Sequence, residues 1–189
     1  MKMTSQPRPW LYPITAVLVS CQSSAPANIT TLAWAGVACS EPVVIGLGIR
    51  PSRHSYSIIK ESGEFVINLP RADQMEIVDT CGMISGRDYN KFEKCGLTAL
   101  PGHKVGAPII AECPVNIECR VSQVIPLGTH DLFLGEVVLI HYDRELMTSG
   151  GFDIDSADPL AYAFGRYYRL GELVGRQGES MLREKRDSE

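Results

Sequence analysis

The sequence lacks the marks of several large protein classes. Its 189 residues carry 18 lysines and arginines against 22 aspartates and glutamates, a formal net charge of −4. This balance argues against a general nucleic-acid binder, although it is compatible with a local basic pocket for one small anion. The chain has no apolar run of about 20 residues and no apolar secretory segment near Met1, so a cytoplasmic protein without a membrane partner is expected.

Metal-binding and dinucleotide-binding motifs are absent as well. The six cysteines form no CxxC pair and have no histidines at ligand spacing, so they indicate no metal site. In a reducing compartment they are expected to be free and mostly buried thiols. Neither GLGIRPSR nor GEVVLIH has the spacing of a Rossmann fingerprint.

What the chain does contain is a series of apolar or alternating segments of strand length. Strands are expected at residues 14–21, 28–40, 42–50, 64–70, 115–126 and 130–143. Two short helices are expected among them: one capped by Ser52 or Ser55 and stopped at Gly63, and one within residues 72–86. Because long helices do not alternate with the strands, the pattern favours a mainly β protein built as a closed antiparallel barrel.

Two strands carry polar residues in a regular alternation. In residues 115–126 this pattern predicts one buried face and one wet face, with Asn116, Glu118, Arg120 and Ser122 on the wet face. The stretch NITTL opens with an amide and two hydroxyls where a small domain should be building its core. Asn28 and Thr30 share one face of that strand and Thr31 lies on the other, so one face is expected to look at something polar other than water.

The segment IRPSRHS offers a candidate anion site. Hydroxyls, a guanidinium and an imidazole meet at the start of the first expected helix, where free backbone N–H groups and the helix dipole attract negative charge. A phosphate fits such a place. The alternative is an ordinary capped helix with Arg53 in solvent.

Several separated motifs, in order, resemble one known family. The segments NITTLAWAGVACSEPVVIGLGIRPSRHSYSIIKESGEFVINLP, GTHDLFLGEV and YYRLGE are similar to the flavin reductase-like, FMN-binding split-barrel family, and within it to the flavoredoxin type. The resemblance covers residues 10–175 and leaves residues 176–189 as a charged tail. It implies a six-stranded split β-barrel with Greek-key character and short flanking helices, which binds FMN non-covalently at a homodimer interface.

The same resemblance implies a set of cofactor-binding residues and no catalytic side chain. By motif, the set is Asn28, Ile29, Thr30, Thr31, Trp34, Ser52, Arg53, His54, Ser55, Lys91, His130, Phe164 and Tyr168. For Trp34 the alternative is core packing, and for Lys91 it is a plain surface lysine. His130 is expected to hydrogen-bond the flavin, cap its strand or gate access to the ring.

The implied activity is an oxidoreductase that moves reducing equivalents from NAD(P)H or a protein donor through FMN to an acceptor. Without a Rossmann fingerprint, the nicotinamide is expected to bind only transiently. The alternatives are a non-catalytic electron carrier of flavoredoxin type and a module that binds flavin or another ligand without turnover. Four C-terminal aromatic residues are expected either at the dimer interface or packed on the barrel: Tyr162, Phe164, Tyr167 and Tyr168.

Overall fold

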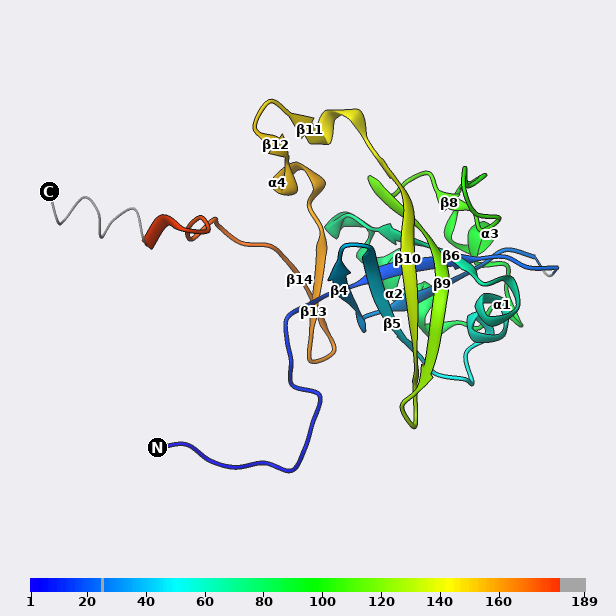
Figure 1. Ribbon diagram of the computed structural model, residues 1–189, viewed down its shortest axis with the longest axis horizontal. Helices are drawn as coiled ribbons and strands as arrows, with labels where there is room; N and C mark the ends of the chain where they lie inside the picture. The colour runs from blue at the N-terminus through cyan, green and yellow to red at the C-terminus, as the bar shows by residue number, and fades with distance from the viewer. Residues whose placement is uncertain (25, 181–189) are drawn as a thin grey trace, which may run out of the picture.

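A curled antiparallel sheet of seven strands forms the body of the protein (Figure 1). The computed structural model describes residues 1–24 and 26–180. In sheet order the strands are β3 (Asn28–Leu32), β2 (Val17–Cys21), β6 (Glu64–Leu69), β9 (Val115–Pro126), β10 (Asp131–Tyr142), β5 (Val43–Ile49) and β4 (Ala35–Ser40). The sheet curls until β3 contacts β5, and the Gly48 N–H donates to the Trp34 carbonyl at 2.8 Å. The mainly β split-barrel prediction is confirmed.

The expected single strand 28–40 is wrong, because it divides into β3 and β4 at opposite ends of the sheet. β3 pairs with β2, whereas β4 pairs with β5, and the chain turns between Leu32 and Ala35. This division makes seven strands where six were expected. The barrel is therefore split between its first and last strands, rather than closed by a continuous ladder within the described residues.

Short helices and small sheets surround the barrel. The helices are α1 (His54–Ser62), α2 (Met75–Met83), α3 (Lys91–Cys95) and α4 (Ile154–Ala157), with 3-10 turns η1 (Ala72–Gln74) and η2 (Arg144–Leu146). The small sheets are β1 (Ile14–Thr15) with β13 (Leu160–Ala163) and β14 (Arg166–Arg169), β7 (Ala99–Leu100) with β8 (Ile109–Ile110), and β11 (Met147–Thr148) with β12 (Gly151–Phe152).

Both terminal segments leave the barrel on the side of the β13–β14 hairpin (Figure 1). The expected charged tail lies outside the described residues from position 181 onward. Among the helices of residues 1–24 and 26–180, none is long and apolar enough to cross a membrane. The cytoplasmic location expected from the sequence stays a prediction.

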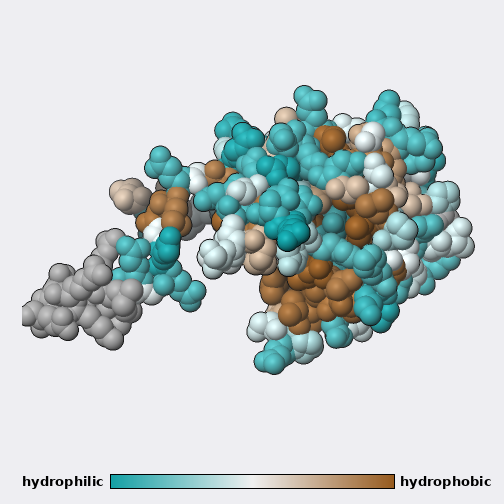
Figure 2. Space-filling model, turned by 90° about the horizontal axis from the view of Figure 1, so that it is seen from above, coloured by the Kyte–Doolittle hydropathy of each residue, from teal (hydrophilic) through white to brown (hydrophobic). Residues whose placement is uncertain are grey.

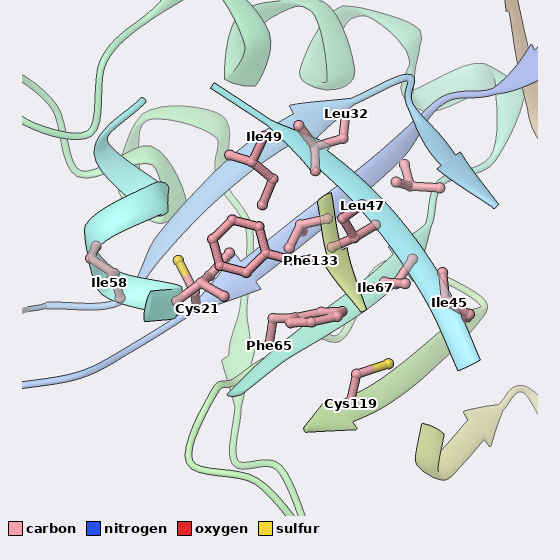
Figure 3. Close-up of a cluster of buried hydrophobic side chains, with 13 residues drawn as sticks. Cys21, Leu32, Ile45, Leu47, Ile49, Ile58, Phe65, Ile67, Cys119 and Phe133 are labelled. Carbon is pink, nitrogen blue, oxygen red and sulfur yellow. The ribbon is translucent and has the colours of Figure 1, made fainter. Parts of the chain in front are cut away.

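The strand β2 is buried on both faces because the core has two layers. Val17 and Val19 belong to the buried cluster of the barrel interior. Phe65 and Phe133 lie at the centre of that cluster (Figure 3). Leu18 belongs to the second layer, which packs beneath α2 and α3. This double burial explains the uninterrupted apolar run of β2.

The wet face predicted for β9 is confirmed at Arg120 and Ser122, which are exposed, and is wrong at Asn116 and Glu118. Asn116 is 5% exposed and Glu118 is fully buried. The Glu118 carboxylate accepts hydrogen bonds from three backbone N–H groups, those of His103 (2.8 Å), Lys104 (2.6 Å) and Val105 (2.9 Å). The loop at residues 103–105, 13 to 15 residues earlier in the chain, therefore covers Glu118, and the alternation within β9 does not predict this.

Gly135 supports the close packing of the barrel interior. A Cβ built on Gly135 would lie 2.3 Å from Phe65 Cζ and 3.1 Å from Cys119 Cβ. Since both neighbours are fully buried, we expect Gly135→Ala to lower the free energy of unfolding by about 2 kcal/mol, measured by urea denaturation. In a Phe65→Leu background, which removes ring atoms, the same change should cost less. Equal losses in both backgrounds would contradict the steric explanation.

Candidate functional site

The helix α1 begins without the side-chain cap expected from the sequence. Its N-cap is Arg53, and within the described chain neither Ser52 nor Ser55 provides a capping hydrogen bond. The stop at Gly63 is confirmed, with a left-handed φ of 69° and an N–H donated to Ile59 O. In the first turn the Tyr56 N–H donates to Arg53 O at 3.1 Å, whereas His54 and Ser55, at the positive end of the helix dipole, line a pocket.

This cavity of about 390 Å³ lies where β3, α1, α3 and the loop after α2 meet, and we call it the cationic pocket. Four of its side chains carry positive charge: Arg50, Arg53, Arg87 and Lys91. The remaining lining residues are Asn28, Thr30, Ser52, His54, Ser55, Met83, Ile84, Ser85 and Gly86. Cations, hydroxyls and a helix N-terminus in one place are the groups that bind a phosphorylated, hydroxylated ligand.

Two buried polar atoms in the cationic pocket have no hydrogen-bond partner among the described residues. They are Asn28 Oδ1 and Ser55 Oγ, on residues that are 3% and 1% exposed. An unsatisfied buried polar group costs about 1–3 kcal/mol, so a structure keeps one where something else satisfies it. The space beside Asn28 Oδ1 exists because residue 86 is a glycine: a Cβ there would lie 2.0 Å from Asn28 Oδ1. These residues fit a ligand with both hydrogen-bond donors and acceptors.

Lys91 is a buried cation and not the surface lysine of the alternative interpretation. It is 4% exposed, and its Nζ donates to the carbonyl of Cys81 at 2.6 Å. Asn90 starts α3 by accepting from the N–H of Phe92, which places Lys91 at the first position of the helix. Burial lowers the pKa of Lys91, the neighbouring thiols oppose this, and the Arg53 charge adds to it. An anion in the pocket would stabilise the charged ammonium and oppose the lowering of its pKa.

A second cavity of about 340 Å³ adjoins the first and shares Arg50 and Arg53 with it. We call it the aromatic pocket, and its other lining residues are Tyr12, Thr31, Leu32, Ala33, Trp34, Gly48, His130 and Tyr162. Trp34 is 44% exposed, with its ring 4.3 Å from that of His130. The core-packing alternative for Trp34 is therefore wrong. Flat rings along a cleft suit a flat ligand.

His130 is held in place by neighbours on both ring nitrogens. Arg50 Nε donates to His130 Nε2 at 3.2 Å, and the Thr129 hydroxyl lies 3.0 Å from Nδ1. Burial, with Arg50 and Arg53 beside it, lowers the pKa of His130. Burial also lowers the pKa of His54, with Arg87 and Lys91 adding to the effect. Both shifts favour the neutral imidazole, so the positive charge of the site comes mainly from arginine and lysine.

The structure brings most of the predicted site residues together. Seven line the cationic pocket: Asn28, Thr30, Ser52, Arg53, His54, Ser55 and Lys91. Thr31, Trp34 and His130 line the aromatic pocket. The Thr31 hydroxyl is already used, since it donates to Val78 O at 2.5 Å on the opposite face from Asn28. The predicted alternation of faces in NITTL is therefore correct.

Three predicted residues line neither pocket in the described chain. Ile29 is fully buried in the layer beneath α2. Phe164 is 62% exposed, with its ring 4.4 Å from that of Tyr12, and Tyr168 is 46% exposed on β14. The side chains of these residues belong to the core or to the outer surface, so any contact with a ligand in the pockets would need another chain or the backbone.

Sequence reasoning missed several lining residues. Arg50 and Tyr12 were not singled out, and neither was the turn after α2 that contains Gly86 and Arg87. The turn carried a usable signal, because ISGR joins glycine, a hydroxyl and a cation directly after a helix. Tyr12 carried none, because it lies in an N-terminal segment that reaches the pocket only through the tertiary fold.

Comparison with known proteins places this geometry in a family. The flavin reductase like domain model matches residues 11–171. An uncharacterized protein of Archaeoglobus fulgidus is 34% identical over 159 residues, 84% of this chain and 89% of that protein. The solved flavoredoxin of Desulfovibrio vulgaris (Miyazaki F) superposes with a TM-score of 0.88 at 32% identity, over 94% of this chain and 97% of that one. The flavoredoxin from Methanosarcina acetivorans superposes with a TM-score of 0.89 at 27% identity, over 96% and 99%. The chain therefore belongs to the family of flavin reductase like domains.

Proposed function

We propose that this chain binds FMN non-covalently and acts as an oxidoreductase that passes reducing equivalents from NAD(P)H or a protein donor to an acceptor. One observation carries the proposal: the two unpartnered polar atoms, Asn28 Oδ1 and Ser55 Oγ, lie buried in a pocket lined by four cations. Family membership supports it, since flavin chemistry is what the matching domain is named for.

The groups of FMN match the two pockets in order. The phosphate suits Arg53, Lys91 and the N–H groups at the start of α1. The hydroxylated chain suits Asn28 Oδ1 and Ser55 Oγ, two buried atoms that lack partners in the described chain. The flat ring suits the aromatic pocket beside Trp34 and His130. Bound FMN would supply the electron and hydride chemistry, which no side chain here provides.

The chain's own residues would bind and orient the cofactor and limit solvent access to it. Arg50 lines both pockets, and its Nε donates a hydrogen bond to His130 Nε2. As the acceptor, His130 Nε2 carries no proton of its own. The Trp34 and His130 rings form one wall of the aromatic pocket. With its cations, hydroxyls and aromatic rings, the site is suited to positioning and electrostatic tuning of the cofactor.

Flavin binding and nicotinamide oxidation are tested in sequence on the purified full chain. We expect added FMN to bind at one per chain, seen as quenched flavin fluorescence and a shifted absorbance band. Under anaerobic conditions, NADH or NADPH should then bleach that band at a catalytic rate. Failure to bind FMN would overturn the proposal as a whole.

A second candidate is a flavoredoxin-type electron carrier. It is favoured by the similarity to two flavoredoxins over more than nine-tenths of this chain. The same experiment separates the two functions, because a carrier would hold FMN but reduce it slowly with either nicotinamide. A module that only binds flavin would also hold FMN and reduce it slowly with either nicotinamide. Unlike the carrier, it would not accept electrons from a one-electron reductant such as a ferredoxin.

The room beside Asn28 gives a direct test of the flavin pocket. Gly86→Ala places a methyl group 2.0 Å from the present position of Asn28 Oδ1 and 2.8 Å from His54 Cδ2. We expect FMN affinity to fall about tenfold, because the amide must turn away from the pocket. Fluorescence titration measures the affinity. Gly171→Ala, where a Cβ meets nothing within 4 Å, should leave it unchanged; equal effects would contradict this role of Gly86.

A homodimer is proposed as the working form. The edge strand β4 is exposed, and a groove of about 340 Å³ beside it is lined by apolar residues that include Val37, Ile154 and Leu170. A contiguous apolar area is open to the surface in Figure 2. Of the C-terminal aromatics, Tyr162 and Tyr167 pack on the second core layer, whereas Phe164 and Tyr168 are left exposed for a partner.

Light scattering tests the dimer. On a size-exclusion column with light-scattering detection, we expect the full chain to have twice the monomer mass. Val37→Lys should shift the mass toward that of the monomer, because Val37 is 72% exposed in the chain alone and a charge there would have to be buried in the dimer. The matched control is Ser122→Lys on β9, away from the groove. A monomer that binds FMN at full strength would contradict the dimer and its link to the site.

A further inference from the structure

Two thiols face one another directly behind the cationic pocket. Cys81 of α2 is fully buried, Cys95 ends α3 and is half-buried, and their sulfur atoms are 3.6 Å apart. Both are free, and in the described chain theirs is the one pair of cysteine sulfurs in hydrogen-bond contact. We propose that this pair is a modification site, which a low-molecular-weight disulfide oxidises to an intramolecular disulfide that secures Lys91 in the pocket.

The positions of the two cysteines allow the bond to form. A disulfide requires a sulfur separation of about 2.05 Å, so the gap must close by about 1.5 Å. Cys95 is the last residue of α3, and Gly96 follows it in a left-handed conformation with φ 64°. A side chain at a helix end next to glycine has freedom to move, and its partial exposure admits a small reagent.

The oxidation proceeds by thiol–disulfide exchange in two steps. The accessible Cys95 thiolate attacks the reagent, forms a mixed disulfide and releases one thiol. The Cys81 thiolate then attacks Cys95 Sγ and releases the second thiol, so two protein thiols are oxidised while one reagent disulfide is reduced to two thiols. Burial raises the pKa of Cys81 to about 12, and the Lys91 charge opposes this. The second step is therefore the slow one, and its rate should rise with pH.

The disulfide would act on the pocket through α3. Lys91 and Cys95 are one helical turn apart, and both contact Cys81, Lys91 through the carbonyl and Cys95 through the sulfur. A helix of five residues frays easily, and each opening removes Lys91 from the pocket. Tying its end to α2 suppresses that opening, so we expect FMN to bind at least about threefold more tightly. This last step rests on the proposed flavin function.

Peptide mapping of the full chain tests the disulfide itself. After incubation with oxidised glutathione, alkylation and trypsin digestion, Cys81 and Cys95 fall in peptides 72–87 and 95–104, each with a single cysteine. We expect these two peptides to be linked, and the Tm of the oxidised chain to rise by about 5 °C. Cys95→Ser should abolish both effects, and Cys39→Ser, which removes an exposed thiol on β4, should change neither.

Other results would overturn the proposal. Separate alkylated peptides, or a lasting glutathione adduct on Cys95, would show that the pair does not close. If Cys95→Ser lowers stability, Cys81→Ala supplies the second variant. Linked peptides with equal FMN affinity in oxidised and reduced protein would refute the effect on Lys91. Absence of FMN binding in both forms would refute the proposed flavin function, while the peptide map would still decide the disulfide.

Discussion

Replacing Glu118 by alanine is expected to lower the free energy of unfolding by about 4 kcal/mol. The fully buried carboxylate accepts from the N–H groups of three consecutive residues, 103–105, and lies 2.5 Å from His141 Nε2. Its removal leaves the buried Val105 N–H and the part-buried N–H groups of His103 and Lys104 without their acceptor, each at a cost of up to about 1–3 kcal/mol, less what water regains. Urea denaturation at pH 7 measures the loss.

Glu136→Ala is the matched control for Glu118→Ala. Glu136 lies on the adjacent strand β10 but is exposed, so its removal should change stability by less than about 0.5 kcal/mol. Amide hydrogen exchange adds a local readout, because residues 103–105 should lose protection in the Glu118 variant. A loss below about 1 kcal/mol would mean that this carboxylate does not hold the loop.

The same carboxylate predicts how stability depends on pH. Burial raises the pKa of Glu118, but the hydrogen bonds from the 103–105 loop and His141 outweigh it, and the net shift is downward from 4.5. A group with a lowered folded-state pKa stabilises fully above its unfolded value, and this stabilisation is lost as pH falls through the folded value. The stability of the native chain should therefore decline below about pH 4.5, and Glu118→Ala should show a flatter profile there.

Replacing Lys91 by methionine is expected to weaken FMN binding about 100-fold. Lys91 is a buried cation in the pocket proposed for the phosphate, and a charge-assisted contact with a dianion is among the strongest polar interactions. Methionine keeps the length and the helix propensity of lysine. Since burial disfavours the ammonium and lowers the pKa of Lys91, the cofactor-free variant should be at least as stable as the native chain. Affinity and stability thus move in opposite directions.

Lys94→Met provides the control for the charge itself. Lys94 lies in the same helix and carries the same charge, but it is exposed, with its Nζ 5.8 Å from the Tyr89 ring centre. FMN fluorescence titration should show less than about a twofold change. If both variants weaken binding equally, the effect comes from the net charge of the protein, and the buried position of Lys91 has no special part.

Local patterns predicted those elements whose reasons are local. The apolar run of β2 and the glycine stop of α1 each depend on neighbouring residues, and each is present. The prediction failed where a distant segment decides the outcome. Glu118 has the pattern of a wet residue, yet it is buried because a loop some 15 residues earlier folds over it. Trp34 is a residue type that usually packs in the core, yet it lies exposed where the chain passes from β3 to β4 across the split in the barrel.

The sequence by itself determined that this protein is a mainly β barrel with a polar face on the strand NITTL and an anion-attracting helix start. These features follow from strand periodicity, turn chemistry and the dipole of a helix end, which act over a few residues. Only the tertiary structure decided that Asn28, Ser55 and Lys91, from three separate elements, line one pocket. It also decided that Cys81 and Cys95 touch. These contacts depend on how β3, α1, α2 and α3 pack together, because segments far apart in the chain determine which side chains are buried and which charges lie close together.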